Sequence, residues 1–119
     1  MSSNKNLLLS SKELMKISRE SNACLTFFIW LCNDKLVRRF SENRNIVIID
    51  ENTEKFLESD GELIFRDYIK NIERLDKIGA VNVLDWDKGY IMINPYICYL
   101  GVRKDYLSVT ELWDKKLKK

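Results

Sequence analysis

Positively charged side chains recur along one flank of a helix that the sequence predicts between about residues 62 and 78. They are Arg66, Lys70, Arg74 and Lys77, and Asn71 is predicted to lie on the same flank. Ammonium and guanidinium groups neutralise phosphates, and the forked side chains of Arg and Asn match the edges of guanine and adenine. The flank therefore has the chemistry to bind a nucleic acid, with Arg66 assigned to guanine and Asn71 to adenine.

A predicted hairpin turn supplies a second candidate contact. Asp87-Lys88-Gly89 is typical of a tight turn, because Gly tolerates the positive φ that such turns need. A lysine at the tip of a hairpin is well placed to bind a phosphate, so Lys88 joins the candidate site. Two interpretations of the neighbouring Trp86 stay open, namely packing against the C-terminal helix and contact with a groove.

The helix charges also have an interpretation that needs no ligand. Glu62, Asp67 and Glu73 stand three or four residues from a Lys or Arg, and such pairs stabilise an exposed helix by about 0.2–0.5 kcal/mol each. The formal net charge is only +2, so attraction for DNA must come from local patches. Further cationic residues are Arg38, Arg39, Arg44, Lys115, Lys116, Lys118 and Lys119.

The composition argues against an enzyme. The chain has no histidine, which removes the commonest general base and the commonest metal ligand. Most of its 18 Asp and Glu residues stand in polar settings, as Glu73, Asp76 and Glu111 do. No phosphate-binding loop, nucleophile elbow or zinc-protease motif occurs. We therefore expect no catalytic residue, no metal, no cofactor and no small-molecule substrate.

The cysteines and the apolar segments indicate the cytoplasm. Cys24, Cys32 and Cys98 are odd in number, lack CxxC spacing and stand among apolar residues, which favours buried reduced thiols. The longest apolar stretch, Leu25–Cys32, is far shorter than the roughly 20 residues of a membrane span. No secretory signal is visible. We expect a cytoplasmic protein that does not bind a membrane.

Hydrophobic spacing predicts the helices that position the candidate residues. They cover about residues 10–20, 23–37, 54–59, 62–78 and 104–119. Ser21 or Asn22 caps the second helix, Asn52 or Thr53 caps the third, and Gly79 ends the fourth. The fourth helix is expected to bury Phe65, Tyr68 or Ile69, Ile72, Leu75 and Ile78, and the last helix Tyr106, Leu107, Val109 or Thr110, and Trp113.

Three short strands complete the predicted fold, over residues 46–49, 80–86 and 90–93, with Pro95 ending the last. A short helix, a glycine turn, a long helix and a hairpin in this order are the plan of a winged helix. We therefore predict an α+β fold, mainly α, with a three-helix core, a short strand and a two-stranded wing. One domain covers residues 1–119, with 1–20 as an N-terminal helical extension, 21–95 as core and wing, and 96–119 as a C-terminal helix and basic tail.

Two stretches carry a family resemblance. Leu75–Val81 has the leucine, acid, glycine and hydrophobic pair that end winged-helix recognition helices, and Gly89–Pro95 runs through a hydrophobic strand to Asn-Pro. With Gly101 and Leu112-Trp113, the chain from about residue 26 to 113 resembles the RepL-like replication proteins of Firmicute plasmids. The resemblance implies a plasmid- or phage-borne protein that binds double-stranded DNA at a replication origin or a similar repeat.

Other roles stay open beside this one. Recognition helices of this family often begin with Ser and Thr, where this chain has Ile64 and Asp67. The short helix is surrounded by Asp50, Glu51, Glu54, Glu58, Asp60 and Glu62, with Lys55 opposing them. A negative surface repels DNA, which leaves a protein-interaction module as another class of function. Plasmid partition, conjugation and transcriptional repression are alternative roles that keep DNA binding.

A homodimer is expected, because palindromic or repeated DNA sites favour proteins with two-fold symmetry. The candidate interfaces are the apolar segment Leu7–Ile17 and the last helix with Trp113. Either segment could equally cover the core of its own chain.

Overall fold

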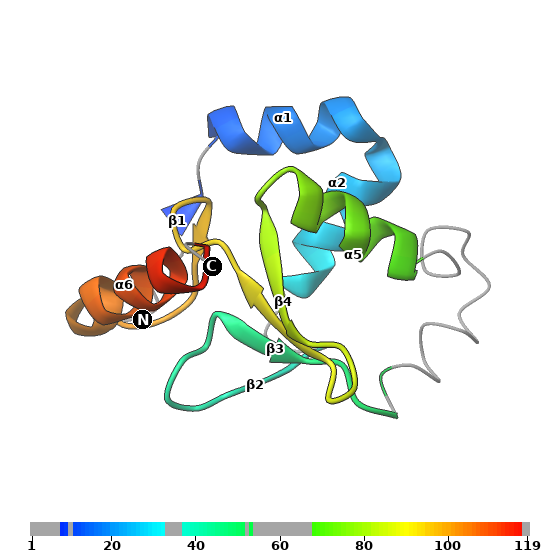
Figure 1. Cartoon of the computed structure of the whole chain (residues 1–119). Helices are drawn as coiled ribbons and strands as arrows, with labels where there is room; N and C mark the ends of the chain where they lie inside the picture. The colour runs from blue at the N-terminus through cyan, green and yellow to red at the C-terminus, as the bar shows by residue number, and fades with distance from the viewer. Residues whose placement is uncertain (1–7, 10, 33–36, 52, 54–67, 118–119) are drawn as a thin grey trace.

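Helices and a small antiparallel sheet build an α+β fold (Figure 1). The computed structural model describes residues 8–9, 11–32, 37–51, 53 and 68–117. The helices of this part are α1 (Ser11–Glu20), α2 (Asn22–Leu31), α5 (Tyr68–Lys77) and α6 (Tyr106–Leu117), the last preceded by the 3-10 turn Arg103–Asp105. The strands are β1 (Leu8–Leu9), β2 (Arg38–Arg39), β3 (Ile46–Ile48), β4 (Val81–Asp85), β5 (Tyr90–Ile93) and β6 (Cys98–Tyr99).

Four of the strands form one antiparallel sheet in the order β2-β3-β5-β4. The predicted short strand, β3, pairs with the second strand of the predicted hairpin, so that Ile46 lies opposite Met92. The hairpin β4–β5 aligns Val81 with Ile93. A separate ladder joins the start of the described chain to the segment after β5, because β1 pairs with β6 and Leu8 lies opposite Tyr99.

Strand β5 is buried on both faces. Ile91 and Ile93 point into a core that α1, α2 and α5 share with the sheet, whereas Met92 between them points into a second core under α6. This division follows from the alternation of side chains along a strand. The sheet therefore has α6 on one face and α1, α2 and α5 on the opposite face.

The two N-terminal helices follow the sequence prediction in part. Helix α1 is confirmed, and Ser21 caps α2 by accepting a hydrogen bond from the backbone N–H of Cys24 at 2.9 Å. Helix α2 is central, with Phe27, Phe28 and Leu31 fully buried. Its predicted extension to about Val37 is wrong, because α2 ends at Leu31.

An arginine from the next strand explains this early end. Arg38 and Arg39, where no strand was predicted, form β2 and pair with Ile48 and Val47. The guanidinium of Arg39 donates to the backbone carbonyl of Leu31 at 2.6 Å. This bond satisfies one of the carbonyls that a helix end leaves without a partner.

The end of α5 is held by the predicted glycine cap. Gly79 has a φ of 83°, its N–H donates to the carbonyl of Asp76 at 3.1 Å, and the N–H of Ala80 donates to that of Leu75 at 2.8 Å. This pair of bonds is a Schellman motif. It turns the chain from α5 directly into β4, so the helix and the hairpin have a fixed relative position.

The hairpin turn is fixed from two sides. Gly89 has a φ of 72°, and its carbonyl accepts a hydrogen bond from the N–H of Ile49 at 2.8 Å. Within the turn, the carboxylate of Asp85 accepts a hydrogen bond from the N–H of Lys88 at 3.1 Å. The predicted hairpin strands are thus confirmed, and β5 ends at Ile93, just before Pro95.

Strand β4 is an edge strand of the sheet. The carboxylate of Asp76, one residue before the end of α5, accepts a hydrogen bond from the N–H of Val83 at 3.3 Å. A side chain therefore occupies a backbone donor that points away from the rest of the sheet.

Two features of the fold carry no visible signal in the sequence. The strands β1 and β6 are two residues long each. Asn45, expected in a polar turn, is 1% exposed. Its amide donates to the carbonyls of Ile93 and Cys98, both at 2.8 Å, and accepts from the N–H of Leu100 at 2.9 Å. One side chain thus ties the end of β5 to β6.

Candidate nucleic-acid interface

The outer surface of α5 presents three of the predicted cationic residues. Lys70, Arg74 and Lys77 are exposed and stand four and three residues apart, so they form one column along the helix. In the described part of the chain, none of the three forms a salt bridge, although Glu73 is exposed on the same surface. Their charges are therefore available to a ligand. The fourth predicted residue, Arg66, lies outside the described residues.

The prediction that Asn71 lies on this flank is wrong. Asn71 is 2% exposed, and its amide oxygen lies 3.5 Å from the thiol sulfur of Cys24 on α2. The buried stripe of α5 runs through Asn71, Ile72 and Leu75. Of the alternatives Tyr68 and Ile69, Tyr68 packs against the core whereas Ile69 is 49% exposed. Ile78, predicted to point inward, is 37% exposed. The side chain of Asn71 thus joins α5 to α2 and cannot reach adenine.

The hairpin turn carries the two remaining predicted residues. Lys88 is exposed, and its ammonium lies 5.8 Å from the centre of the Tyr90 ring. Trp86 is 53% exposed and lies next to α5, where it lines a pocket together with Ile69 and Ile72. The alternative in which Trp86 packs against the C-terminal helix is therefore wrong.

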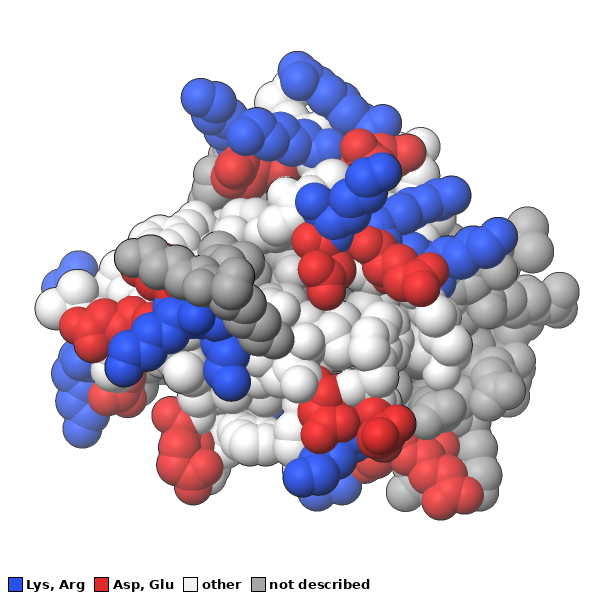
Figure 2. Space-filling view, viewed as in Figure 1, with Lys and Arg blue, Asp and Glu red and all other residues white. Residues whose placement is uncertain are grey.

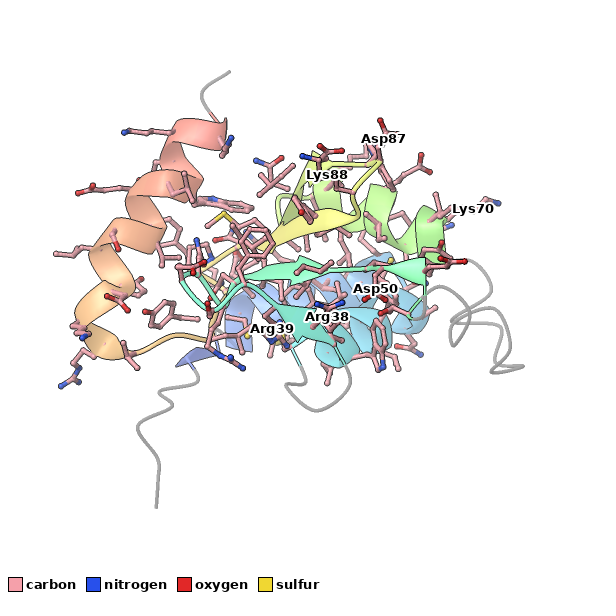
Figure 3. All side chains as sticks on the ribbon, turned by 90° about the horizontal axis from the view of Figure 1, so that it is seen from below. Arg38, Arg39, Asp50, Lys70, Asp87 and Lys88 are labelled. Carbon is pink, nitrogen blue, oxygen red and sulfur yellow. The ribbon has the colours of Figure 1, made fainter. Side chains whose placement is uncertain are left out.

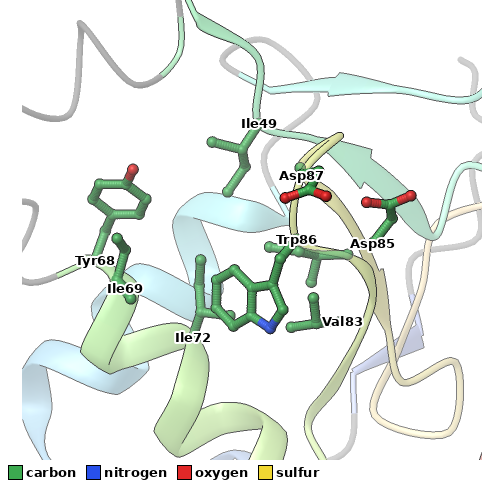
Figure 4. Close-up of a pocket in the computed structure, with 10 residues that line it drawn as sticks. Ile49, Tyr68, Ile69, Ile72, Val83, Asp85, Trp86 and Asp87 are labelled. Carbon is green, nitrogen blue, oxygen red and sulfur yellow. The ribbon is translucent and has the colours of Figure 1, made fainter.

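A pocket of about 160 Å³ lies between the hairpin and α5 (Figure 4). Its lining residues are Ile49, Tyr68, Ile69, Ile72, Val83, Asp85, Trp86, Asp87, Gly89 and Ile91. Most of them are apolar, and the two charged ones are Asp85 and Asp87. In Figure 4 both carboxylates lie at the hairpin, on the opposite side of the pocket from Tyr68 and Ile69. Sequence reasoning missed this pocket, because it forms where two elements meet.

The charges of this face are unevenly distributed. Figure 2 shows Lys and Arg gathered over α1 and α5, with some carboxylates among them, and Asp and Glu near the hairpin. On α1 the exposed cations are Lys12, Lys16 and Arg19, of which Lys16 pairs with Glu13 at 3.2 Å. Their spacing of four and three residues was a helical-face signal that the sequence analysis did not use.

Two further cations serve the fold. Arg38 forms a salt bridge of 2.7 Å with Asp50 (Figure 3), and Arg39 caps α2 as described above. Asp50 also accepts hydrogen bonds from the N–H and the hydroxyl of Thr53, both at 3.0 Å. The bond from the Thr53 N–H, followed by that from Arg38, holds the pKa of Asp50 below its usual value. Asn52 and the helix over 54–59 that Asn52 or Thr53 was predicted to cap lie outside the described residues.

The candidate dimer segments are largely occupied within the chain. Trp113 is 1% exposed under the sheet, and Ile17 of α1 is 1% exposed in the main core. The apolar side chains that these two helices do expose are Met15, at 60%, and Leu107, at 72%. Leu107 was predicted to face inward, and that prediction is wrong.

Metal and membrane sites were also sought in the described residues. No group of three or more Cys, Asp or Glu side chains is arranged there to hold a metal ion. The thiols of Cys24 and Cys98 are buried and that of Cys32 is half-buried. No helix in this part of the chain is long and apolar enough to cross a membrane. Searches of protein-family models, curated proteins and solved structures each find no match to the chain.

Proposed function

We propose that this chain is a winged helix-turn-helix DNA-binding protein of a plasmid or phage, acting in replication initiation or control. The path of the chain supports the winged-helix assignment. Helix α2 packs against α5, α5 leads through the Schellman motif into the hairpin β4–β5, and β3 pairs with β5. A winged helix has a helix core, a short strand and a two-stranded wing, and this path of the chain agrees with that plan.

The observation that carries DNA binding is the exposed column of Lys70, Arg74 and Lys77, none of which pairs with a carboxylate in the described part of the chain. An α-helix about 10 Å across fits the major groove of B-DNA, which is about 12 Å wide. With α5 in the groove, the column contacts phosphates along one side, and Lys88 on the hairpin turn reaches the adjacent backbone.

The replication role is supported by the sequence resemblance alone, and the structure gives its Asn-Pro motif a physical reason. The amide of Asn94 donates to the carbonyl of Gly79 at 2.8 Å and accepts from the N–H of Tyr96 at 2.8 Å. It thereby joins the exit of the hairpin to the end of α5. The proposal includes two copies on a palindromic or repeated site.

The test is a double substitution on α5. Replacing Lys70 and Arg74 by Ala removes two phosphate contacts, and each contact contributes about 0.9 to the slope of log K against log salt. We expect weaker binding and a slope smaller by about 1.8 for the double variant. Fluorescence anisotropy with a DNA duplex, titrated at several salt concentrations, measures both quantities.

Lys115→Ala with Lys116→Ala is the matched control, since it removes the same charge from α6, which lies at the other end of the molecule from Lys70 (Figure 3). An unchanged slope in the α5 variant, or an equal loss in both variants, would contradict the proposed interface.

A second candidate function is a protein-interaction module without DNA binding. The hairpin turn favours it, because Asp85 and Asp87 flank the single cation Lys88 and a net negative turn repels phosphates. A gel shift of the unmodified protein with random DNA at low salt separates the two functions. Retardation supports DNA binding, and free migration of the DNA supports the protein-interaction module.

A further inference from the structure

We propose that the pocket between α5 and the hairpin binds a small organic cation with an apolar body about as large as one six-membered ring. This binding site is separate from the DNA contacts proposed above and does not depend on them. The argument rests on the size of the pocket, its walls, its charge and the rigidity of the turn that forms one side.

The size sets the scale of the ligand. The pocket volume is about 160 Å³, and an apolar cavity of about 150 Å³ in a protein takes up benzene. A molecule of one ring with a short substituent therefore fits.

The walls favour an apolar body. Ile69 and Ile72 of α5 face the hairpin residues Val83 and Ile91 across the pocket, and Trp86 lies beside them. Ile69 and Trp86 are about half exposed, at 49% and 53%, so a ligand would remove apolar surface from water. This burial supplies the non-specific part of the affinity.

The charge of the pocket selects a cation. Among the described residues that line it, Asp85 and Asp87 are the charged ones, and neither forms a salt bridge there. Asp87 is exposed at the turn, next to Trp86 in the sequence. A carboxylate attracts a cation through its charge and repels an anion, and the face of an indole attracts a cation through the ring quadrupole. The carboxylate of Asp85 holds the turn by accepting the N–H of Lys88.

The position of Asp87 is fixed before any ligand binds. The N–H of Gly89 donates to the carbonyl of Trp86 at 3.3 Å, and the N–H of Ile49 donates to the carbonyl of Gly89 at 2.8 Å. Asp87 lies inside this bonded turn. A ligand therefore meets a carboxylate whose backbone is already ordered, which lowers the entropy cost of binding.

The experiment compares three probes of similar size on the full chain without DNA: benzylammonium, benzyl alcohol and benzoate. Tryptophan fluorescence reports binding at the pocket, because Trp86 is exposed whereas Trp30 and Trp113 are 7% and 1% exposed. We expect a saturable change with benzylammonium, binding of benzyl alcohol about tenfold weaker, and no change with benzoate. Equal responses to the cation and the alcohol, or no response to the cation, would overturn the proposal.

Asp87→Asn tests the carboxylate. Asp87 is exposed and takes part in no hydrogen bond or salt bridge in the described part of the chain, so its removal leaves the fold intact. We expect benzylammonium to bind about fivefold more weakly, as for loss of one partly screened ion pair, with benzyl alcohol unchanged. Glu111→Gln on α6 removes the same charge far from the pocket and leaves both affinities unchanged. Equal affinity of Asp87→Asn and the unmodified chain for benzylammonium would refute the assignment.

Discussion

Within the described residues, Gly79 and Gly89 adopt positive φ angles, and their surroundings differ. At Gly79, with a φ of 83°, an added Cβ has open space around it. At Gly89, with a φ of 72°, an added Cβ would overlap the backbone carbonyl of Ile49. That carbonyl belongs to the strand end that also hydrogen-bonds to Gly89. Position 89 therefore needs glycine both for its backbone conformation and for lack of space. Position 79 needs glycine for its backbone conformation alone.

Gly79→Ala and Gly89→Ala measure the two effects separately. We expect Gly79→Ala to lower the free energy of unfolding by about 1 kcal/mol, the cost of the left-handed conformation. Gly89→Ala adds the steric overlap and should cost about 2–3 kcal/mol. Urea denaturation of both variants checks this order. Equal losses would show that the contact with Ile49 relaxes without cost.

Individual residues show where pattern reasoning works and where it stops. The glycine cap at Gly79 and the cap at Ser21 were predictable, because each follows from backbone geometry near one helix end. The position of Asn71 was predicted wrongly, because its polar side chain suggested the exposed face although its spacing from Leu75 places it in the buried stripe of α5. The bonds of Asn45 connect residues up to 55 positions apart, so no local pattern reveals them.

At the scale of elements, the sequence predicted long periodic segments and missed short paired ones. The described part of α5 and the hairpin strands agree with the predicted segments, since each has clear periodicity and a turn residue at its end. Strands β1, β2 and β6 have two residues each, and that length carries no period. Their existence depends on the partner strand, which only the folded chain supplies.

The carboxylate of Asp50 connects Arg38 of β2 to Thr53, after β3, and these bonds give a pH-dependent prediction. Because the bonds from Thr53 and Arg38 lower the pKa of Asp50 in the folded state, its stabilisation is present above the unfolded pKa of about 3.9 and is lost as the pH falls through the lower folded value. We expect Asp50→Asn to lower the free energy of unfolding by about 0.5–1 kcal/mol near neutral pH and by nothing at about pH 2.

Denaturation curves of both proteins across this pH range provide the measurement. Glu111→Gln, at an exposed carboxylate of α6, is the control and should show no such dependence. If the free energies of unfolding of Asp50→Asn and the unmodified chain still differed at pH 2, the charge of Asp50 would not be the cause of the difference.

At the scale of the whole molecule, the second core makes the C-terminal segment part of the domain. The sequence predicted a C-terminal helical extension, whereas α6 covers one face of the sheet through Trp113 and Val109. The β1–β6 ladder adds a contact between the start of the described chain and the segment that leads to α6. Composition and periodicity predicted the helix, and its docking site could not be predicted because it depends on Met92 and Tyr99 from other elements.

Two substitutions in α6 test this docking. Trp113→Ala leaves a cavity under the sheet, and such a truncation of a buried tryptophan costs about 3–5 kcal/mol. Leu107→Ala, at a side chain that is 72% exposed in the same helix, should change the free energy of unfolding by less than about 0.5 kcal/mol. Thermal denaturation followed by circular dichroism compares the two. Similar melting temperatures would mean that α6 contributes little to the fold.

The carboxylate of Asp76 has a consequence for how copies of this protein behave toward one another. It binds the N–H of Val83 on the outer side of β4, and the opposite edge of the sheet, β2, is only two residues long. A strand from another molecule that approaches β4 therefore meets a backbone N–H that is already hydrogen-bonded, and at β2 it could pair with only two residues. In the described part of the chain this sheet has four strands, and we expect these two borders to disfavour strand-to-strand polymerisation of the folded protein.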